Sequence, residues 1–179
     1  MEQKRNIILV CVALALITAA FLAVKLVGES VFLGTHHQLS PGALEGLASS
    51  LAGSNQIIGL AQPSSLAWLP GESGVFGAGV KSTYPEERIF YFRVIFESVL
   101  ESASPPSQAE QWVSFPSQKA IPAGGIETFE ILVRPVNPPA GSYFYRLLVC
   151  ETEQCQSLSS PGIYATATFS FRVLPAGSG

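Results

Sequence analysis

The sequence predicts an all-β fold, an antiparallel β-sandwich that follows one N-terminal transmembrane helix. Two observations carry this prediction. One is an uninterrupted apolar run near the start of the chain, and the other is the pattern after Ile57, where β-branched and aromatic runs alternate with Pro and Gly at short intervals. No strand-like run alternates with a long helical pattern, so a parallel α/β architecture is not expected.

The apolar run extends from Ile7 to Val24 and continues to Val27. As a helix that rises 1.5 Å per residue, it is long enough to cross about 30 Å of hydrocarbon. The basic residues Lys4 and Arg5 precede it and Lys25 lies at its far edge, a bias that favours a cytoplasmic N-terminus and an extracytoplasmic body. We therefore expect a single-pass protein of the cell membrane that contacts lipid through this helix.

A cleaved secretory signal is the alternative interpretation of the same run. It would require a shorter apolar core that ends in a small-x-small cleavage site. Ala19, Ala20 and Ala23 supply small residues, but the apolar stretch continues past them without a turn breaker. We expect the segment to be retained as an anchor, with Cys11 as a small apolar side chain within it.

The composition argues against several classes of function. The net charge is -3 and there is no basic run, so nucleic-acid binding is not expected. All 13 acidic residues are Glu, which removes the Asp of a Ser-His-Asp triad, Asp-rich calcium loops and an aspartyl dyad. No pairing of the remaining Glu, Lys, Tyr or Cys residues indicates acid–base catalysis. We expect a non-enzymatic protein without cofactor, metal ion or small-molecule substrate.

A short amphipathic helix is expected in the segment between the anchor and the sandwich. Ser40 and Pro41 are typical of an N-cap and a first helical position, and Gly53 suits a C-terminal stop. Its apolar face comprises Leu44, Leu47, Ala48 and Leu51. The helix is expected to pack on the domain or to rest at the membrane surface. Two adjacent histidines, His36 and His37, are expected in a solvated loop, since neighbours diverge too far to chelate one ion alone.

Four segments alternate clearly between apolar and polar side chains and are predicted as the long strands. In the first, Arg88–Phe96, the side chains of Phe90, Phe92 and Val94 point to one side, and the other side is mixed. The other three are residues 126–133, 143–149 and 163–173, and each has a dry face and a wetter one.

Weaker strand candidates lie around residues 64–69, 74–82 and 111–115, the last of which carries Trp112. Roughly seven strands over ~115 residues match the size and strand number of an immunoglobulin-like sandwich with a shared aromatic core. The predicted organisation is a cytoplasmic N-terminus at 1–6, a transmembrane helix at 7–27, a spacer with the short helix at 28–56, the sandwich at 57–175 and a flexible tail at 176–179.

Cys150 and Cys155 bracket four residues at the expected tip of a hairpin between the last two strands. In an exported domain such a pair is expected to oxidise, and closure of so short a loop contributes about 2 kcal/mol in the loop-entropy model. A metal site would need more ligands than two thiols, and a redox role would favour the closer Cys-x-x-Cys spacing. We predict a structural disulfide between them, with Cys11 free.

The strand 88–96 alone has large apolar groups on both faces, and a second apolar face on a sheet is usually covered. Tyr91, Arg93 and Ile95 on this second face are therefore the candidate interaction surface. The equally weighted alternative is a central strand that the spacer helix or a long loop covers.

Short motifs in the second half of the chain resemble a recurring pattern. They are Ile-Pro-Ala-Gly-Gly at 121–125, a strand that ends at Arg134-Pro135, and Pro-Ala-Gly-Ser-Tyr at 139–143. From about 64 to 174 the chain resembles the immunoglobulin-like modules of archaeal and bacterial envelope proteins, the group that includes NEW3 and CARDB-type domains. A tight turn with positive φ at Gly141 is expected, with the Tyr143 ring inside and its hydroxyl outside.

The resemblance implies binding, spacing or display and no catalytic residue. A second likeness, to the membrane-anchored stator subunits of the archaeal motility filament, rests on architecture alone. We expect an envelope protein whose sandwich binds or scaffolds another envelope or filament protein. Homo-oligomers are compatible with this hypothesis. The alternative is a pilin-like filament subunit whose N-terminal helix packs in a filament core. Against it, Lys25 interrupts the apolar surface and no small residue follows Lys4 and Arg5.

Overall fold

The computed structural model describes residues 35–102 and 105–177. They belong to Thr35–Gly179, one of two compact units into which the chain divides. The predicted cytoplasmic residues 1–6, the transmembrane helix at 7–27 and Cys11 lie outside the described residues. Among the residues that are described, no helix has both the length and the apolar character needed to cross a membrane.

The described elements are mostly β-strands. In chain order they are β1 (His36–His37), α2 (Ala43–Ala52), β2 (Ile58–Ala61), β3 (Ala67–Trp68), β4 (Ser73–Lys81), β5 (Arg88–Leu100), the 3-10 helix η1 (Ala109–Trp112), β6 (Val113–Ser114), β7 (Gln118–Ile121), β8 (Ile126–Val133), β9 (Gly141–Cys150) and β10 (Ile163–Val173).

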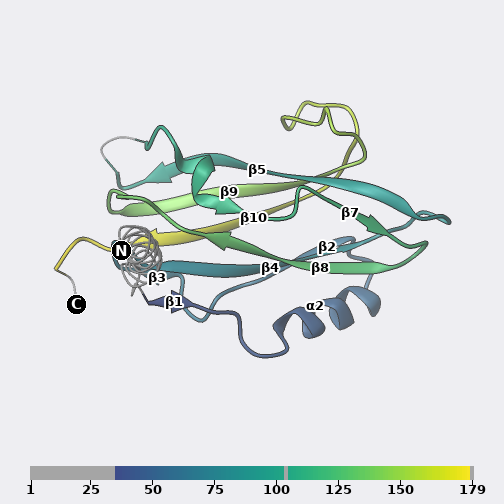
Figure 1. Ribbon diagram of the computed structural model, residues 1–179, viewed down its shortest axis with the longest axis horizontal. Coiled ribbons are helices and arrows are strands. Elements are labelled where there is room, and N and C mark those ends of the chain that lie inside the picture. Colours follow the sequence, from purple (N-terminus) through teal and green to yellow (C-terminus); the bar gives the residue numbers. More distant parts are fainter. Residues whose placement is uncertain (1–34, 103–104, 178–179) are drawn as a thin grey trace, which may run out of the picture. The chain divides into compact units, whose positions relative to one another are not determined.

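These strands form two five-stranded sheets that face each other as a sandwich (Figure 1). The first sheet has the order β1-β4-β8-β6, and β2 pairs with β4 beyond the end of β1. The second sheet has the order β3-β10-β9-β5-β7. The long pairings are antiparallel, whereas the two-residue strands β1 and β3 pair in parallel with β4 and β10. The predicted all-β, immunoglobulin-like sandwich is confirmed at this level.

Aromatic rings fill the space between the two sheets. The ring centroids of Phe92 in β5 and Phe129 in β8 lie 4.5 Å apart. Those of Phe76 in β4 and Phe169 in β10 lie 4.8 Å apart. Each of these contacts joins opposite sheets, so the expected shared aromatic core is confirmed. The predicted inward residues of β9 are fully buried, namely Tyr143, Tyr145, Leu147 and Val149.

The helix α2 covers the outer face of the first sheet, below β4 and β8 in Figure 1. Its predicted apolar face is the one that packs, and Leu51 is fully buried there. Two glycines of β4 lie in the strand surface beneath it. A Cβ at Gly77 would lie 2.7 Å from Leu44 Cδ2, and one at Gly79 would lie 2.8 Å from Leu51 Cδ1. The missing side chains therefore let the helix lie close against the sheet.

The start of α2 differs from the prediction. The helix begins at Ala43 behind Gly42, and Ser40 makes no side-chain cap, because Ser40 and Pro41 form a turn in which the Ser40 carbonyl accepts the Ala43 N–H. The predicted stop at Gly53 is confirmed, since this residue is the C-cap.

The two histidines correct a second expectation. Instead of a solvated loop, His36 and His37 form β1 and pair with Ser73 and Gly74 at the start of β4. His37 Nε2 lies 3.0 Å from a carboxylate oxygen of Glu72, and its ring stacks on Trp68 at 5.8 Å. From Thr35 onward, segment 28–56 belongs to the same compact unit as the strands, and α2 packs on the domain, which is one of the two places expected for it.

Several short elements also differ from expectation. Trp112 ends η1, so only Val113 and Ser114 of the candidate at 111–115 are extended. The strands β2 and β7 were not predicted.

Gly141 has the expected positive φ of 156°. The hydroxyl of Tyr143 does not face outward, since it donates to the Pro139 carbonyl at 2.6 Å. A Tyr bonded in this way to backbone just upstream is a feature of immunoglobulin-like sandwiches.

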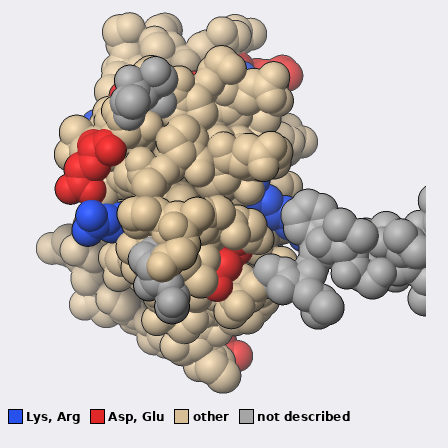
Figure 2. Space-filling view, turned by 90° about the vertical axis from the view of Figure 1, so that its left-hand side faces the viewer, with Lys and Arg blue, Asp and Glu red and all other residues tan. Residues whose placement is uncertain are grey.

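One end of the sandwich gathers the loops that follow β3, β5, β8 and β10. The register shows this, because Leu100 pairs with Ser142 and Gly141 pairs with Val173. The start of β4 and the end of β8 meet at the same end, where Gly74 pairs with Val133. Figure 2 looks onto this end, and uncharged side chains make up most of the view.

Candidate functional site

The candidate site is the outer face of the second sheet. Residues that lie directly opposite each other on neighbouring strands share a face of a sheet. Arg93 pairs with Leu148, which pairs in turn with Thr166, and Ile95 pairs with Arg146. The pairs continue along β5, β9 and β10, and we define the outer face by Tyr91, Arg93, Ile95, Phe144, Arg146, Leu148, Thr166 and Thr168.

A disulfide-centred cluster lies on this outer face. Cys150 and Cys155 are joined, with their Cα atoms 6.0 Å apart, so the predicted crosslink is confirmed. Together with Leu148 they form a second apolar cluster, separate from the core between the sheets, against which Tyr91 and Ile95 pack. The crosslink therefore holds the start of the β9–β10 loop down on the sheet. Figure 1 shows the rest of this loop rising beyond β5.

Removing the disulfide should loosen this corner of the face. We expect Cys150→Ser with Cys155→Ser to lower the free energy of unfolding by about 2 kcal/mol, because the unfolded chain is no longer constrained. Urea unfolding with and without reductant measures the effect. Cys11→Ser is the matched control and should leave the reductant-dependent shift intact. A wild-type midpoint that does not respond to reductant would contradict the assignment.

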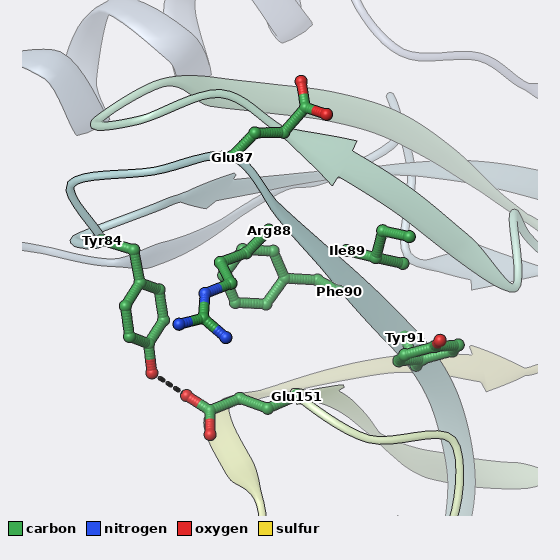
Figure 3. A pocket seen from close by; sticks show the side chains of 7 residues that line it. All are labelled: Tyr84, Glu87, Arg88, Ile89, Phe90, Tyr91 and Glu151. Carbon is green, nitrogen blue, oxygen red and sulfur yellow. Dashed lines mark hydrogen bonds between the residues drawn. The ribbon is translucent and has the colours of Figure 1, made fainter.

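A hollow of about 240 Å³ opens where β5 begins (Figure 3). Its walls include Tyr84 from the β4–β5 loop, Arg88 and Tyr91 from β5, and Glu151 from the β9–β10 loop. The Arg88 guanidinium carbon lies 5.0 Å from the centre of the Tyr84 ring, a cation–π contact. The Tyr84 hydroxyl donates a hydrogen bond to the Glu151 carboxylate. Two loops distant in sequence are thus joined across the hollow.

The hydrogen bond has an electrostatic consequence. Glu151 accepts the hydrogen bond from Tyr84, and this bond, with smaller contributions from desolvation and the carboxylate charge, raises the pKa of Tyr84 above its ordinary value of 10.0. The hydroxyl therefore stays protonated at neutral pH and acts as a donor rather than as a base.

A second hollow, of about 170 Å³, is lined in part by Tyr91 as well. Arg93, Gln118 of β7 and Glu153 of the β9–β10 loop contribute polar groups to it, and the disulfide forms part of its wall. Tyr91 lines both hollows.

The groups around these hollows suit recognition better than catalysis. Tyrosine and arginine are enriched where proteins contact one another, because each combines a large apolar surface with hydrogen-bond donors. The described histidines are at the opposite end, in β1, which pairs with the start of β4. Within residues 35–102 and 105–177, no three His, Cys, Asp or Glu side chains are grouped as they would be to hold a metal ion.

The structure places all three predicted surface residues on one face, with unequal exposure. Arg93 is exposed, whereas Tyr91 and Ile95 are partly buried against the disulfide cluster. The hollows add Tyr84, Glu151 and Glu153, which the sequence did not single out. Their nearness depends on two loops that meet only in the folded chain, although the predicted disulfide already indicated where one of them lies.

Comparisons with known proteins give only distant likenesses. No protein-family model and no curated protein matches the chain. Among solved structures, it is similar to the Caenorhabditis elegans MSP family member WR4. The two are 10% identical, the match covers 67% of this chain and all of the other chain, and the TM-score is 0.36. An alpha-2-macroglobulin of Escherichia coli gives 16% identity over 67% of this chain but 9% of its own, with a TM-score of 0.44. The CupB2 chaperone of Pseudomonas aeruginosa gives 13% identity, coverage of 66% and 56%, and a TM-score of 0.37.

Proposed function

We propose that this chain is a non-enzymatic, single-pass membrane protein of the cell envelope. Its sandwich, outside the cytoplasm, binds another envelope or filament protein through the outer face of the second sheet. This role agrees with the resemblance to NEW3 and CARDB-type envelope modules. The proposed anchor is the apolar segment 7–27, whose length fits a bilayer.

The unequal covering of the two sheets is the observation that carries the binding proposal. The first sheet has α2 packed against its outer face. The second sheet has no such helix among the described residues, and there the β9–β10 loop is pinned beside Tyr91 by the disulfide. In this sandwich a helix covers the outer face of one sheet, whereas the disulfide-linked loop covers only part of the other, and the remainder of that face is available to partners.

Arg93 offers the sharpest test, because it is exposed on this face while its neighbours Tyr91 and Ile95 contribute to packing. We expect Arg93→Glu to weaken the native complex roughly ten-fold, since a central arginine at an interface is often a hot spot. The thermal midpoint should stay nearly unchanged. Native electrophoresis of membranes solubilised in mild detergent measures the complex.

The control is Glu130→Arg, a charge reversal at an exposed position of β8 in the first sheet. It should leave the complex intact. If both variants migrate like the wild type, the outer face of the second sheet is not the binding surface.

A further inference from the structure

Exposed apolar side chains lie at the end of the sandwich that faces the viewer in Figure 2. Leu69 follows β3 and is 36% exposed, Leu100 ends β5 and is 55% exposed, and Val136 in the β8–β9 loop is 65% exposed. All three belong to the end where Leu100 pairs with Ser142 and Gly141 pairs with Val173. We call this end of the sandwich, with Leu69, Leu100 and Val136 exposed on it, the apolar end.

Two ion pairs lie near the apolar end, and Arg134, two residues before Val136, is a further exposed charge. Arg172 lies 2.9 Å from Glu101, and Glu72 lies 3.0 Å from His37. Glu72 also accepts the Leu69 N–H at 2.6 Å, so its carboxylate is engaged within the fold. Burial alone would raise the pKa of Glu72, but the hydrogen bonds from His37 and Leu69 outweigh it and lower that pKa. Arg134, Arg172 and Glu101 are exposed at this end, so its charged groups stay in the polar headgroup layer while the aliphatic side chains reach deeper.

The chain enters the sandwich at this same end. Its first described strand, β1, pairs with Ser73 and Gly74, where β4 begins. Seven residues, 28–34, separate the predicted membrane span from Thr35. Even fully extended, such a stretch spans at most about 25 Å. A domain tethered this closely, and through this end, stays within reach of the bilayer.

We propose that the apolar end of the sandwich rests on the lipid bilayer, with Leu69, Leu100 and Val136 in the interfacial layer. This proposal rests on the membrane anchor of the proposed function. The occupant is lipid, because the tether keeps this end near the membrane while the outer face of the second sheet remains free for a protein. Loops tipped with aliphatic side chains and little net charge gain apolar contact in the interface.

Depth-sensitive fluorescence on the full chain tests the proposal. Val136→Cys and, as the matched control, Leu158→Cys are made in a Cys11→Ser background and labelled with an environment-sensitive dye. Leu158 is 51% exposed in the β9–β10 loop at the opposite end. The proteins are reconstituted in phosphatidylcholine vesicles with or without nitroxide-labelled lipid. We expect a blue-shifted emission and several-fold stronger lipid quenching at position 136 than at 158.

The possible outcomes separate the two proposals. If the protein floats with the vesicles but both labels are quenched equally little, the membrane contact is wrong and the anchor stands. If the protein does not float, the anchor fails and the contact falls with it. A label at 136 that is shielded only at high protein density, without lipid quenching, would assign the apolar end to a second copy instead.

Discussion

Replacing Trp68 with Ala is expected to lower the free energy of unfolding by about 3–5 kcal/mol, the range for removal of a large aromatic side chain from a core. Trp68 is fully buried, stacks on Phe171 at 4.2 Å and donates its indole N–H to the Ser65 carbonyl at 2.8 Å. It also contacts the His37 ring, so it joins β3 and β10 of one sheet to β1 of the other. Urea unfolding followed by far-UV circular dichroism measures the loss.

Gly74 supplies a sharper test of the same packing. A Cβ at Gly74 would lie 2.2 Å from Cζ2 of Trp68, so Gly74→Ala alone should cost roughly 1–3 kcal/mol through overpacking. In the Trp68→Ala background the ring is gone and the new methyl group has space. The double variant should therefore be more stable than the sum of the two losses predicts, by about 1 kcal/mol or more. Losses that simply add would show that Trp68 does not occupy the space above Gly74.

The long strands were predictable because one face of each meets the core. Alternation with a period of two residues identified β8, β9 and β10, and it identified β5 as far as Phe96. Beyond that point a bulge between Phe96 and Ser98 shifts the register, and the strand continues to Leu100 without a clear alternating pattern. The pattern thus predicts a strand well only where burial is one-sided and the register is regular.

The short edge strands could not be predicted in this way. β1 has two residues and β7 has four, too few to show a period. They are extended because a neighbour with unpaired backbone groups lies beside them, which is a property of the folded chain. The same holds for His36 and His37, whose place in a sheet depends on Ser73 and Gly74 more than thirty residues away.

The candidate site shows a similar division. The spacing of Cys150 and Cys155 was enough to predict their crosslink, and the mixed face of β5 was enough to single out Tyr91, Arg93 and Ile95. The sequence pattern did not predict which of the two outer faces α2 covers. The signal lies in the glycines of β4, where Gly77 and Gly79 leave space for leucines of the helix. Glycine in a strand indicates a close neighbour without naming it.

Gly141 is the position where a single methyl group should have the next largest effect. It starts β9 with φ 156°, a conformation that side chains other than glycine rarely adopt. A Cβ there would also lie 2.7 Å from the carbonyl oxygen of Leu100, a backbone atom of the paired strand that cannot rotate away. We therefore expect Gly141→Ala to lower the free energy of unfolding by about 3 kcal/mol, through backbone strain and the clash together.

Gly124 separates these two causes. Its φ is also positive, at 62°, but a Cβ there would meet nothing within 4 Å. Gly124→Ala should therefore cost only the left-handed backbone penalty of about 1 kcal/mol. Thermal unfolding measures the stability of both variants. Tyr143→Phe is measured with them, because the Tyr143 hydroxyl bonds to Pro139 just before Gly141, and the comparison tests whether residues 139–143 act as one structural unit. If Gly141→Ala and Gly124→Ala lose the same stability, the Leu100 carbonyl does not crowd Gly141, and strain alone accounts for the glycine.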